Sequence, residues 1–469
     1  MRTNKYLFLI VMFFVVSVTT FAQDCNCESN FEWLKITFEE NDAGAQYAIN
    51  KKGQASYNIH NQLIAEKVKS ATDIYDCTNI LNEWLRFFRS GHLGIEFLPE
   101  AIKETSTKDK LFYEWETLTI DTVEFKKYLD NKPDSDFEGI WDDGIYKIGV
   151  RKINNQYIGF IISSDYEDWT EGQVKFKISA DSVTYYMRNR SMVNGKPTLR
   201  NSNMLCFDEI GVVFIRIYPI NEDKSLQSLI VNKHYLEKLN NNTFYFRIPS
   251  FIPEYKSLID SIINANFDEI INTENLIIDL RNNGGGLDNS WTNLLPILYT
   301  NPVRTRAAEF LSTELNNQMM LNLSKNSLDK EWAEQSYNRL KNRIGEFVNI
   351  FDFDVHSGTM DTIYIFPKNV GIIVNSSCGS ATEQFLLAAK QSKKVKIFGT
   401  KTFGALDFSN VNIIKSPCNE FQLYYALSKT IGFENFPIDD IGIQPDFYLD
   451  NKIPEYKWIE YVNKILNNE

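Results

Sequence analysis

The sequence predicts a mixed α/β protein built from two or three parts, and three observations lead to this prediction. At 469 residues the chain exceeds one ordinary domain, and its hydrophobic content of 43% is that of a globular protein. Short apolar runs of strand length dominate residues 110–240. From residue 241 to residue 469, strand-like runs alternate with helical stripes, which is the pattern of an α/β domain.

Residues 1–22 have the composition of a cleavable export signal. Arg2 and Lys5 precede an apolar run that ends in Thr20-Phe21-Ala22. The run is short for a membrane span, and polar residues follow it directly. We therefore expect cleavage after Ala22, no stable membrane insertion afterwards, and a periplasmic or extracellular protein. A retained membrane anchor is the alternative.

Export would bring the six cysteines into an oxidising compartment, where they can form disulfides. Their spacing fits no zinc motif, and we expect neither a metal nor another cofactor. Cys77 is expected to pair with Cys25 or Cys27, which would tie the start of the mature chain to a helix. Cys378 is expected to be a small buried residue in a tight turn, rather than a nucleophile or a redox switch.

The charge of the chain argues against one class of partner. The formal net charge is −12, and no block of Lys and Arg interleaves with aromatic residues. Nucleic-acid binding depends on neutralising phosphates with clustered cations. We therefore expect no nucleic-acid partner.

Residues 23–100 are predicted to form an N-terminal helical domain. Its clearest helix has apolar residues at helical spacing, namely Ile80, Leu81, Trp84, Leu85 and Phe88. That helix should stop at the small-residue segment 90–94, which contains His92.

Residues 110–240 are predicted to form a β-rich accessory module. The segments 144–150 and 157–162 alternate between apolar and polar residues, and Asn154-Asn155 makes a turn between them. We expect this module to gate or shape a substrate cleft.

Residues 241–469 are predicted to form an α/β domain. Its expected strands are 244–248, 276–280, 363–366, 370–374 and 395–398. Its expected helices are 255–271, a helix from 294 onward, an inserted helical pair within 313–348, 382–390 and an amphipathic helix at the C-terminus.

Ser380 is the candidate nucleophile. It follows a predicted strand and Gly379, and it begins a predicted helix, whose N-terminus favours developing negative charge. A serine hydrolase needs a nucleophile, a base, a group that orients the base, and an oxyanion hole. The alternative is a helix-capping serine, because Ser380 and Glu383 have the spacing of a capping box.

Gly284-Gly285-Gly286 after a buried strand offer amide donors without obstructing side chains. A phosphate-binding loop is excluded, because neither GxxxxGK[ST] nor GxGxxG is present. Asp279 and Arg281 just before the glycines are expected to pair and hold the end of the strand.

The order of these motifs resembles the C-terminal processing (tail-specific) protease family and its tricorn-protease relatives. The stretch LIIDLRNNGGG is followed by the GSATE turn of residues 379–383 and then by FGTKTFG. The resemblance covers about 240–450, and 77–97 resembles the N-terminal region of secreted Bacteroidetes-type members. It implies a crotonase-like (ClpP/crotonase-type) β-α spiral with Ser380 as nucleophile. The implied oxyanion hole uses the amides of Ala381 and Gly285 or a neighbouring glycine such as Gly286.

The general base departs from the pattern of the family's serine–lysine members. Those members carry lysine after the Thr-Phe-Gly turn, but here Ala405 follows it, and we expect the nearby Lys401 to point elsewhere. Of the four histidines, His92 lies in a turn that resembles the histidine-bearing turn of the tricorn-like members. By this resemblance His92 is the base, and an unperturbed histidine pKa of about 6.5 suits that role.

The same resemblance suggests the groups that assist the base. Asp439 holds the place of the base-orienting acid, and Glu383 is the alternative. Ser90 would bridge acid and base. The remaining histidines His234 and His356 are expected on surface elements.

These features predict a secreted serine endopeptidase that acts on peptide or protein substrates. The first alternative is a catalytically inactive family member that binds peptides or another hydrophobic ligand, which the loss of lysine at Ala405 supports. An esterase acting on other acyl compounds is a second alternative. The family's usual PDZ module has no counterpart in the glycine pattern of residues 100–240, so its mode of substrate recognition does not transfer.

Overall fold

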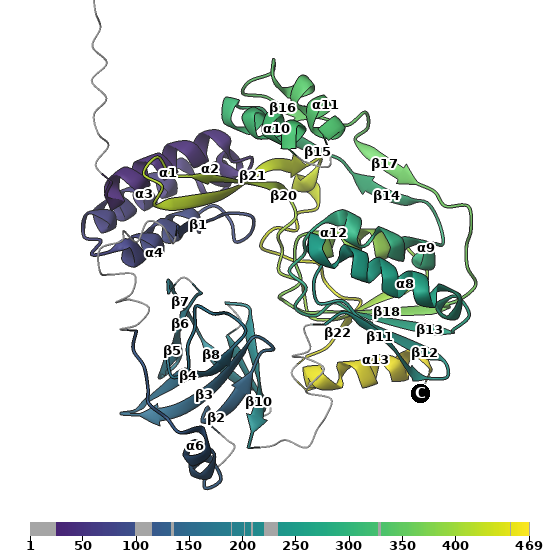
Figure 1. Ribbon diagram of the computed structural model, residues 1–469. Helices are drawn as coiled ribbons and strands as arrows, with labels where there is room; N and C mark the ends of the chain where they lie inside the picture. Colours follow the sequence, from purple (N-terminus) through teal and green to yellow (C-terminus); the bar gives the residue numbers. More distant parts are fainter. Residues whose placement is uncertain are drawn as a thin grey trace, which may run out of the picture.

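The computed structural model describes residues 25–98, 115–132, 136–188, 190–200, 202–207, 210–219, 233–326, 330–450 and 452–468. The described residues form a mixed α/β structure with sheets of nine, six, five and two strands (Figure 1). The predicted signal segment 1–22 lies outside them. Within the described ranges, no helix has both the length and the apolar composition needed to cross a bilayer.

The six-stranded sheet carries the segment with Ser380. Its order is β11 (Tyr235–Asn240), β12 (Thr243–Arg247), β13 (Asn275–Asp279), β18 (Asn369–Val374), β19 (Val395–Gly399) and β22 (Phe447–Tyr448), parallel from β12 onward. Because β13 and β18 are parallel neighbours, their carboxyl ends lie at one edge of the sheet. The glycine run and the serine turn, which follow these strands, therefore meet at that edge.

Helices cover both faces of this sheet (Figure 1). The helices α8 (Lys256–Ile270), α9 (Leu295–Leu298) and α12 (Ala381–Ala389) lie on one face, and α13 (Trp458–Leu466) lies on the other. Successive residues of β13 point to opposite faces, so Leu276 and Ile278 pack with α8 and α12 while Ile277 packs with α13. This two-sided burial explains why the strand is apolar throughout.

The N-terminal helices pack on a sheet made mainly from the C-terminal half of the chain. They are α1 (Cys27–Asn41), α2 (Ala45–Lys52), α3 (Gln54–Lys69) and α4 (Ile74–Leu85). The sheet consists of β1 (Gly94–Phe97), β15 (Ala308–Leu311), β16 (Phe347–Asn349), β20 (Phe408–Lys415) and β21 (Phe421–Thr430). Side chains from both sets share one hydrophobic core.

Two disulfides reinforce this arrangement. Cys27 bonds to Cys77, which joins α1 to α4, and this resolves the choice that the sequence left open. Cys25 bonds to Cys418 in the turn between β20 and β21. The start of the described chain is thus fixed to a hairpin near its end.

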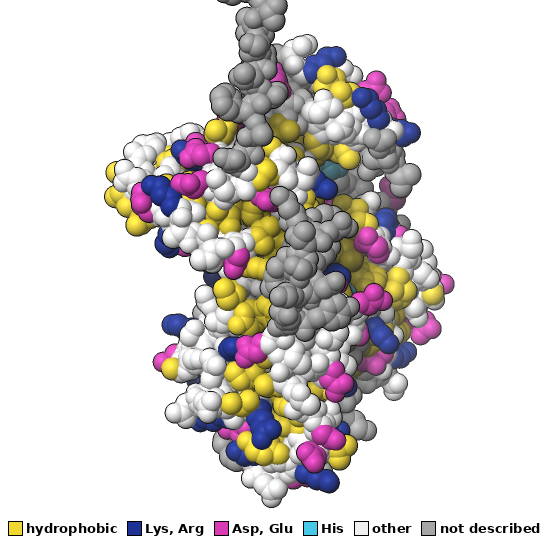
Figure 2. All heavy atoms as spheres, turned by 60° about the vertical axis from the view of Figure 1, so that its left-hand side comes forward, with side chains coloured by type: hydrophobic (Ala, Val, Ile, Leu, Met, Phe, Trp, Pro, Cys, Tyr) yellow, Lys and Arg dark blue, Asp and Glu magenta, His cyan; other side chains and the backbone are white. Residues whose placement is uncertain are grey.

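The accessory module is a nine-stranded antiparallel sheet. Its strands are β2 (Gly139–Asp142), β3 (Tyr146–Ile153), β4 (Gln156–Ser164), β5 (Val174–Ser179), β6 (Ser182–Tyr186), β7 (Met192–Gly195), β8 (Pro197–Arg200), β9 (Met204–Phe207) and β10 (Val212–Tyr218). The module has its own aromatic core. On the molecular face drawn in Figure 2, acidic and basic side chains are interspersed over its surface.

Several local expectations were wrong. Strand β1 lies in the segment predicted to be helical, and helix α6 (Thr122–Leu129) lies in the segment predicted to be strands. Residues 363–366 form no strand. The inserted helical pair is confirmed as α10 (Glu314–Asn326) and α11 (Lys330–Leu340), and a two-stranded sheet of β14 (Val303–Arg306) and β17 (Val355–Gly358) lies close by.

Candidate active site

Ser380 stands in the turn between β18 and α12, in a backbone conformation that L-residues rarely adopt. Its φ is 56° and its ψ is −124°. Such a residue costs about 1–3 kcal/mol and persists only where its surroundings impose it. The Glu383 carboxylate helps to impose it, because it accepts the Ser380 N–H at 3.2 Å. Strain of this kind is concentrated at functional sites.

The side chain of Ser380 meets His92, which lies 288 residues earlier in the sequence. Ser380 Oγ and His92 Nε2 are 3.0 Å apart. His92 also has a left-handed backbone, with φ of 55°. Two strained turns from distant parts of the chain therefore meet at one hydrogen bond.

The other ring nitrogen of His92 fixes the tautomer. Nδ1 lies 2.6 Å from the carbonyl oxygen of Phe408, and a carbonyl only accepts hydrogen bonds. Nδ1 therefore carries the proton, which leaves Nε2 free to accept from the Ser380 hydroxyl. The pKa of His92 lies below 6.5, mainly because the imidazole is buried. The charge of Arg89 lowers this pKa further, whereas the hydrogen bond to the Phe408 carbonyl and the charge of Asp42 raise it. The imidazole is accordingly neutral at neutral pH.

A buried ion pair holds the turn that carries His92. The Arg89 guanidinium donates to both carboxylate oxygens of Asp42, at 2.7 and 2.6 Å. It also donates to the carbonyls of Gly91 and His92, at 3.0 and 3.2 Å. Asp42 in turn accepts the N–H of Ala426 in β21 at 2.9 Å. The position of the imidazole is thus linked to the core that the two ends of the chain share.

The same turn occupies the space beside Ala405. A Cβ added to Gly91 would lie 2.3 Å from the Cβ of Ala405 and 3.2 Å from its Cα. A lysine side chain at position 405 would have to displace this turn. A small residue at position 405 therefore leaves room for the turn that carries His92.

The predicted oxyanion-hole residues lie together, but one amide is already used. Gly285 packs on the catalytic turn so closely that an added Cβ would meet Ser380 Cβ at 2.8 Å and Ala381 N at 2.9 Å. However, its N–H donates to Asn283 Oδ1 at 3.0 Å. In the described structure, the N–H groups of Gly286 and Ala381 donate to no protein acceptor. These two amides remain available for a substrate oxygen.

The expected acids do not contact the imidazole, and here the expectation needs correction. Glu383 instead accepts the N–H groups of Gly404 and Ala405, both at 2.8 Å, and the Thr402 hydroxyl at 2.5 Å. Its pKa is raised by burial, against these hydrogen bonds. Glu383 therefore braces the turn that follows the nucleophile helix.

Asp439 and Ser90 also serve the backbone around the site. Asp439 accepts the N–H groups of Leu406 and Asp407 at 2.6 and 2.7 Å, while its Oδ2 is buried without a partner in the described structure. Burial, and next the charge of Asp407, raise the pKa of Asp439 to about 7. Ser90 donates its N–H to Asp440 Oδ1 at 3.0 Å. The group on His92 Nδ1 is the Phe408 carbonyl, which has no signature in a sequence.

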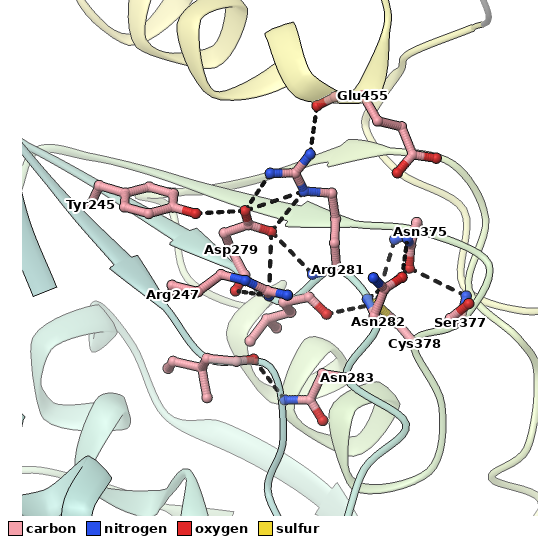
Figure 3. Close-up of polar contacts among 12 residues, drawn as sticks. Tyr245, Arg247, Asp279, Arg281, Asn282, Asn283, Asn375, Ser377, Cys378 and Glu455 are labelled. Atoms are coloured by element: carbon pink, nitrogen blue, oxygen red, sulfur yellow. Dashed lines mark hydrogen bonds and ion pairs between the residues drawn. The ribbon is translucent and has the colours of Figure 1, made fainter. Parts of the chain in front are cut away.

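Behind the glycine run, Asp279 and Arg281 form the expected pair (Figure 3). Arg281 Nε lies 2.9 Å from Asp279 Oδ1, and Arg281 also donates to the Glu455 carbonyl. The Tyr245 hydroxyl donates to Asp279 at 2.8 Å. Although burial opposes ionisation, the two arginines Arg281 and Arg247 hold the pKa of Asp279 well below its usual range. This network fixes the end of β13 and the start of the glycine run.

Asparagines that the sequence reading missed connect the two turns (Figure 3). Asn375 accepts the Asn282 N–H at 3.0 Å and donates to the Asn282 side chain at 2.8 Å. Asn283 accepts the N–H of Gly379 and the hydroxyl of Thr382 through its carbonyl, at 3.2 and 2.9 Å. Asparagine is common in turns generally, so its presence alone does not distinguish this role.

Cys378 is fully buried and its thiol donates to the Leu280 carbonyl at 3.0 Å. Burial raises the pKa of this thiol to about 12, so it is no nucleophile at neutral pH.

Other candidate groups lie apart from the Ser380–His92 pair. Lys401 is exposed and lines a different cavity. His356 is exposed as expected, but His234 is only 8% exposed, and its Nε2 bonds to the Ser250 carbonyl at 2.8 Å. In the part of the chain that is described, no three His, Cys, Asp or Glu side chains are grouped to hold a metal ion.

The sequence profile of peptidase family S41 matches residues 242–449. This part of the chain is an S41 peptidase domain. The resemblance to the C-terminal processing proteases is thereby confirmed, and the enzyme is a serine peptidase. Ser380 lies within the S41 domain, whereas His92 lies outside it and reaches the site from the N-terminal segment.

Solved structures align with most of the chain and extend beyond its S41 domain. Mature CPAF complexed with lactacystin matches with a TM-score of 0.52 and 14% identity, over 95% of this chain and 99% of that chain. The photosystem II D1 C-terminal processing protease matches with a TM-score of 0.41 and 12% identity, over 94% and 97% of the two chains. No curated protein sequence matches the chain. The CPAF match shows that the two chains share a fold.

Proposed function

We propose that the chain is an exported serine endopeptidase that hydrolyses peptide bonds through an acyl-enzyme on Ser380, with His92 as general base. The observation that carries this proposal is the 3.0 Å contact between Ser380 Oγ and His92 Nε2. The Phe408 carbonyl on Nδ1 supports it, because it leaves Nε2 as the proton acceptor. The low pKa of His92 supports it as well, because a buried neutral imidazole is a competent base at neutral pH.

The reaction follows from these groups. His92 Nε2 takes the proton from Ser380 Oγ while Oγ attacks the carbonyl carbon of the scissile bond. The amides of Ala381 and Gly286 donate to the oxyanion, and each such donor is worth about 3 kcal/mol in comparable enzymes. The imidazolium then gives its proton to the leaving amine, and water hydrolyses the acyl-enzyme by the reverse sequence. The Phe408 carbonyl holds Nδ1–H throughout, in the place of a carboxylate.

Export to the periplasm or the outside of the cell is part of the proposal. The charged and apolar pattern of residues 1–22 supports it. The disulfides Cys25–Cys418 and Cys27–Cys77 support it too, because such bonds persist in oxidising compartments.

We also propose that the S41 domain has a crotonase-like spiral and that the chain has three parts, 23–100, 110–240 and 241–469. The separate aromatic core of the β-rich module supports an independent accessory unit. The core shared by α1–α4 and β21 instead joins the first and last parts.

The alternative of an inactive binding protein rested on the loss of lysine at position 405. A neutral histidine contacts the nucleophile in place of that lysine, and the histidine turn occupies the space beside Ala405. We therefore prefer the catalytic proposal.

The proposal is tested by labelling the purified mature protein with a fluorophosphonate and measuring its intact mass. We expect wild type and the exposed control His356→Ala to gain one probe mass, and Ser380→Ala and His92→Ala to gain none. Labelling that survives Ser380→Ala would refute the nucleophile, and labelling at the wild-type rate in His92→Ala would refute the base. Hydrolysis of matched peptide and ester substrates then separates a peptidase from an esterase.

A further inference from the structure

A cavity of about 300 Å³ lies between α12, β14 and the segment that precedes β20, and the mechanism above does not use it. Its lining is mainly apolar and includes Leu387, Ala388, Leu406, Phe433 and Phe436. Phe433 is buried, whereas Leu387 and Phe436 are 37% and 68% exposed, so the cavity opens to solvent. Its volume is at the lower end of the range for ligand pockets, which suits one large side chain.

The cavity begins one helical turn from the nucleophile. Gln384, Leu387 and Ala388 line it, and their spacing of three and four residues defines one face of α12, while Gln391 lines it from the turn after this helix. Ser380 precedes Gln384 by four residues and accepts its N–H through its carbonyl, so it stands at the head of that face. Four residues of helix span about 6 Å, and an extended peptide advances about 3.3 Å per residue. The cavity is thus within reach of a residue one to three places from the scissile bond.

The walls of the cavity are held by hydrogen bonds that do not require a ligand. Gln391 accepts the Arg304 N–H and donates to the Arg304 carbonyl, both at 2.8 Å, which fixes β14 to the turn that follows α12. On the opposite wall, Asp407 accepts the N–H groups of Ile438 and Asp439 at 2.7 and 2.8 Å. Phe408, whose carbonyl orients His92, directly follows this wall. A preformed pocket saves the ordering cost that binding otherwise carries.

The charges at the rim are positive. Arg304 and Arg306 are exposed on β14, and the Arg306 guanidinium lies 5.0 Å from the Phe436 ring centre while donating to the Gly432 carbonyl. Asp407 in the lining offsets one of the two positive charges, and its Oδ2 accepts two backbone N–H groups, so the two arginines still leave the rim with a positive excess. An acidic group beside the apolar side chain would therefore be favoured.

We propose that this cavity is a specificity pocket that binds a large apolar side chain of the substrate, with a preference for an acidic residue next to it. The inference rests on the proposed peptidase activity of Ser380. It names the class of substrate: extended peptides with an aromatic or branched aliphatic residue within three places of the scissile bond.

The test is a positional-scanning peptide library, cleaved by wild type, Leu387→Gln and Arg304→Gln. The control is Leu258→Gln, which changes a leucine of α8 that is 44% exposed and does not line the cavity. The quantity compared is the ratio of kcat/KM for Phe over Ala at the preferred position, because a general loss of activity cancels in it. We expect this ratio to fall roughly tenfold in Leu387→Gln and to stay unchanged in Leu258→Gln. Arg304→Gln should lose the preference for an adjacent acid.

A second readout does not depend on turnover. Peptides chosen from the library are titrated against Ser380→Ala and against Ser380→Ala combined with Leu387→Gln, with fluorescence anisotropy as the signal. Weaker binding of the Phe peptide but not of the Ala peptide in the double variant supports the pocket. Cleavage by wild type without an apolar preference, or an unchanged ratio in Leu387→Gln, would overturn the pocket alone. A folded wild type that neither cleaves nor labels would overturn the proposed function and the pocket with it.

Discussion

The glycine run allows a matched comparison of two neighbouring residues, Gly284 and Gly285. In Gly285→Ala the new Cβ would lie 2.8 Å from the Gly379 carbonyl oxygen, 2.8 Å from Ser380 Cβ and 2.9 Å from Ala381 N. The φ of 107° at Gly285 adds strain, because L-residues rarely adopt it. At Gly284, by contrast, an added Cβ would meet nothing within 4 Å.

The magnitude follows from these contacts. An L-residue in such a backbone conformation costs about 1–3 kcal/mol, and overpacking costs about 1–3 kcal/mol more. Two of the crowded atoms are backbone atoms of the catalytic turn, so the strain is relieved by moving Ser380 away from His92. A shift of about 1 Å at a catalytic group costs about 100-fold in rate. We expect Gly285→Ala to lower kcat/KM by about that factor. We expect Gly284→Ala to keep the wild-type kcat/KM and to change the free energy of unfolding by no more than about 0.5 kcal/mol.

The assay is the second-order rate of fluorophosphonate labelling, together with kcat/KM on one peptide and the thermal midpoint of each variant. The reasoning is refuted if Gly285→Ala labels at the wild-type rate while folded. An equal loss of activity in Gly284→Ala and Gly285→Ala would also refute it, because an added Cβ is crowded at position 285 and meets nothing within 4 Å at position 284.

Three further predictions concern groups around and away from the site. The value of kcat/KM should rise with pH and level off, with a midpoint below pH 6.5. The reason is that burial lowers the pKa of His92 and only the neutral imidazole accepts a proton. A midpoint above pH 6.5 would contradict this prediction. Arg89→Met leaves Asp42 buried without its cation, so unfolding in urea should show a loss of about 3–5 kcal/mol, and a loss below 1 kcal/mol would argue against the pair. Burial lowers the pKa of Lys175, which lies 4.1 Å from the ring centre of Trp169, to about 7, so the unfolded chain binds more protons between that value and about 10.4. The stability of wild type relative to Lys175→Met should therefore rise with pH across this window, and a constant difference in urea unfolding would disprove it.

Local order in the sequence predicted the elements that carry the nucleophile. The apolar strands ending in the glycine run and in the Ser380 turn are formed as expected, because their periodicity and small-residue turns are local properties. The resemblance to a protease family also singled out His92, and the structure brings it to Ser380.

Contacts between distant segments explain the failures. Strand β1 is only four residues long and exists because β21, more than three hundred residues later, pairs with it. The partner of His92 Nδ1 is a main-chain carbonyl at Phe408, which any residue type supplies. The burial of Arg89 and Asp42 could not be predicted from the sequence. Charged residues are rarely buried unless they are paired, and these two partners lie 47 residues apart.

The shared core also sets the order in which activity can arise during synthesis. His92 leaves the ribosome long before Ser380, and the strand that receives β1 ends only at Thr430. The disulfide between Cys25 and Cys418 spans 393 positions and closes only once residue 418 has been made. A chain that ends before β21 therefore contains either no nucleophile or a histidine turn without the strand that pairs with β1. The contact between Ser380 and His92 can therefore form with its supporting sheet only after the segment up to Thr430 has joined the fold.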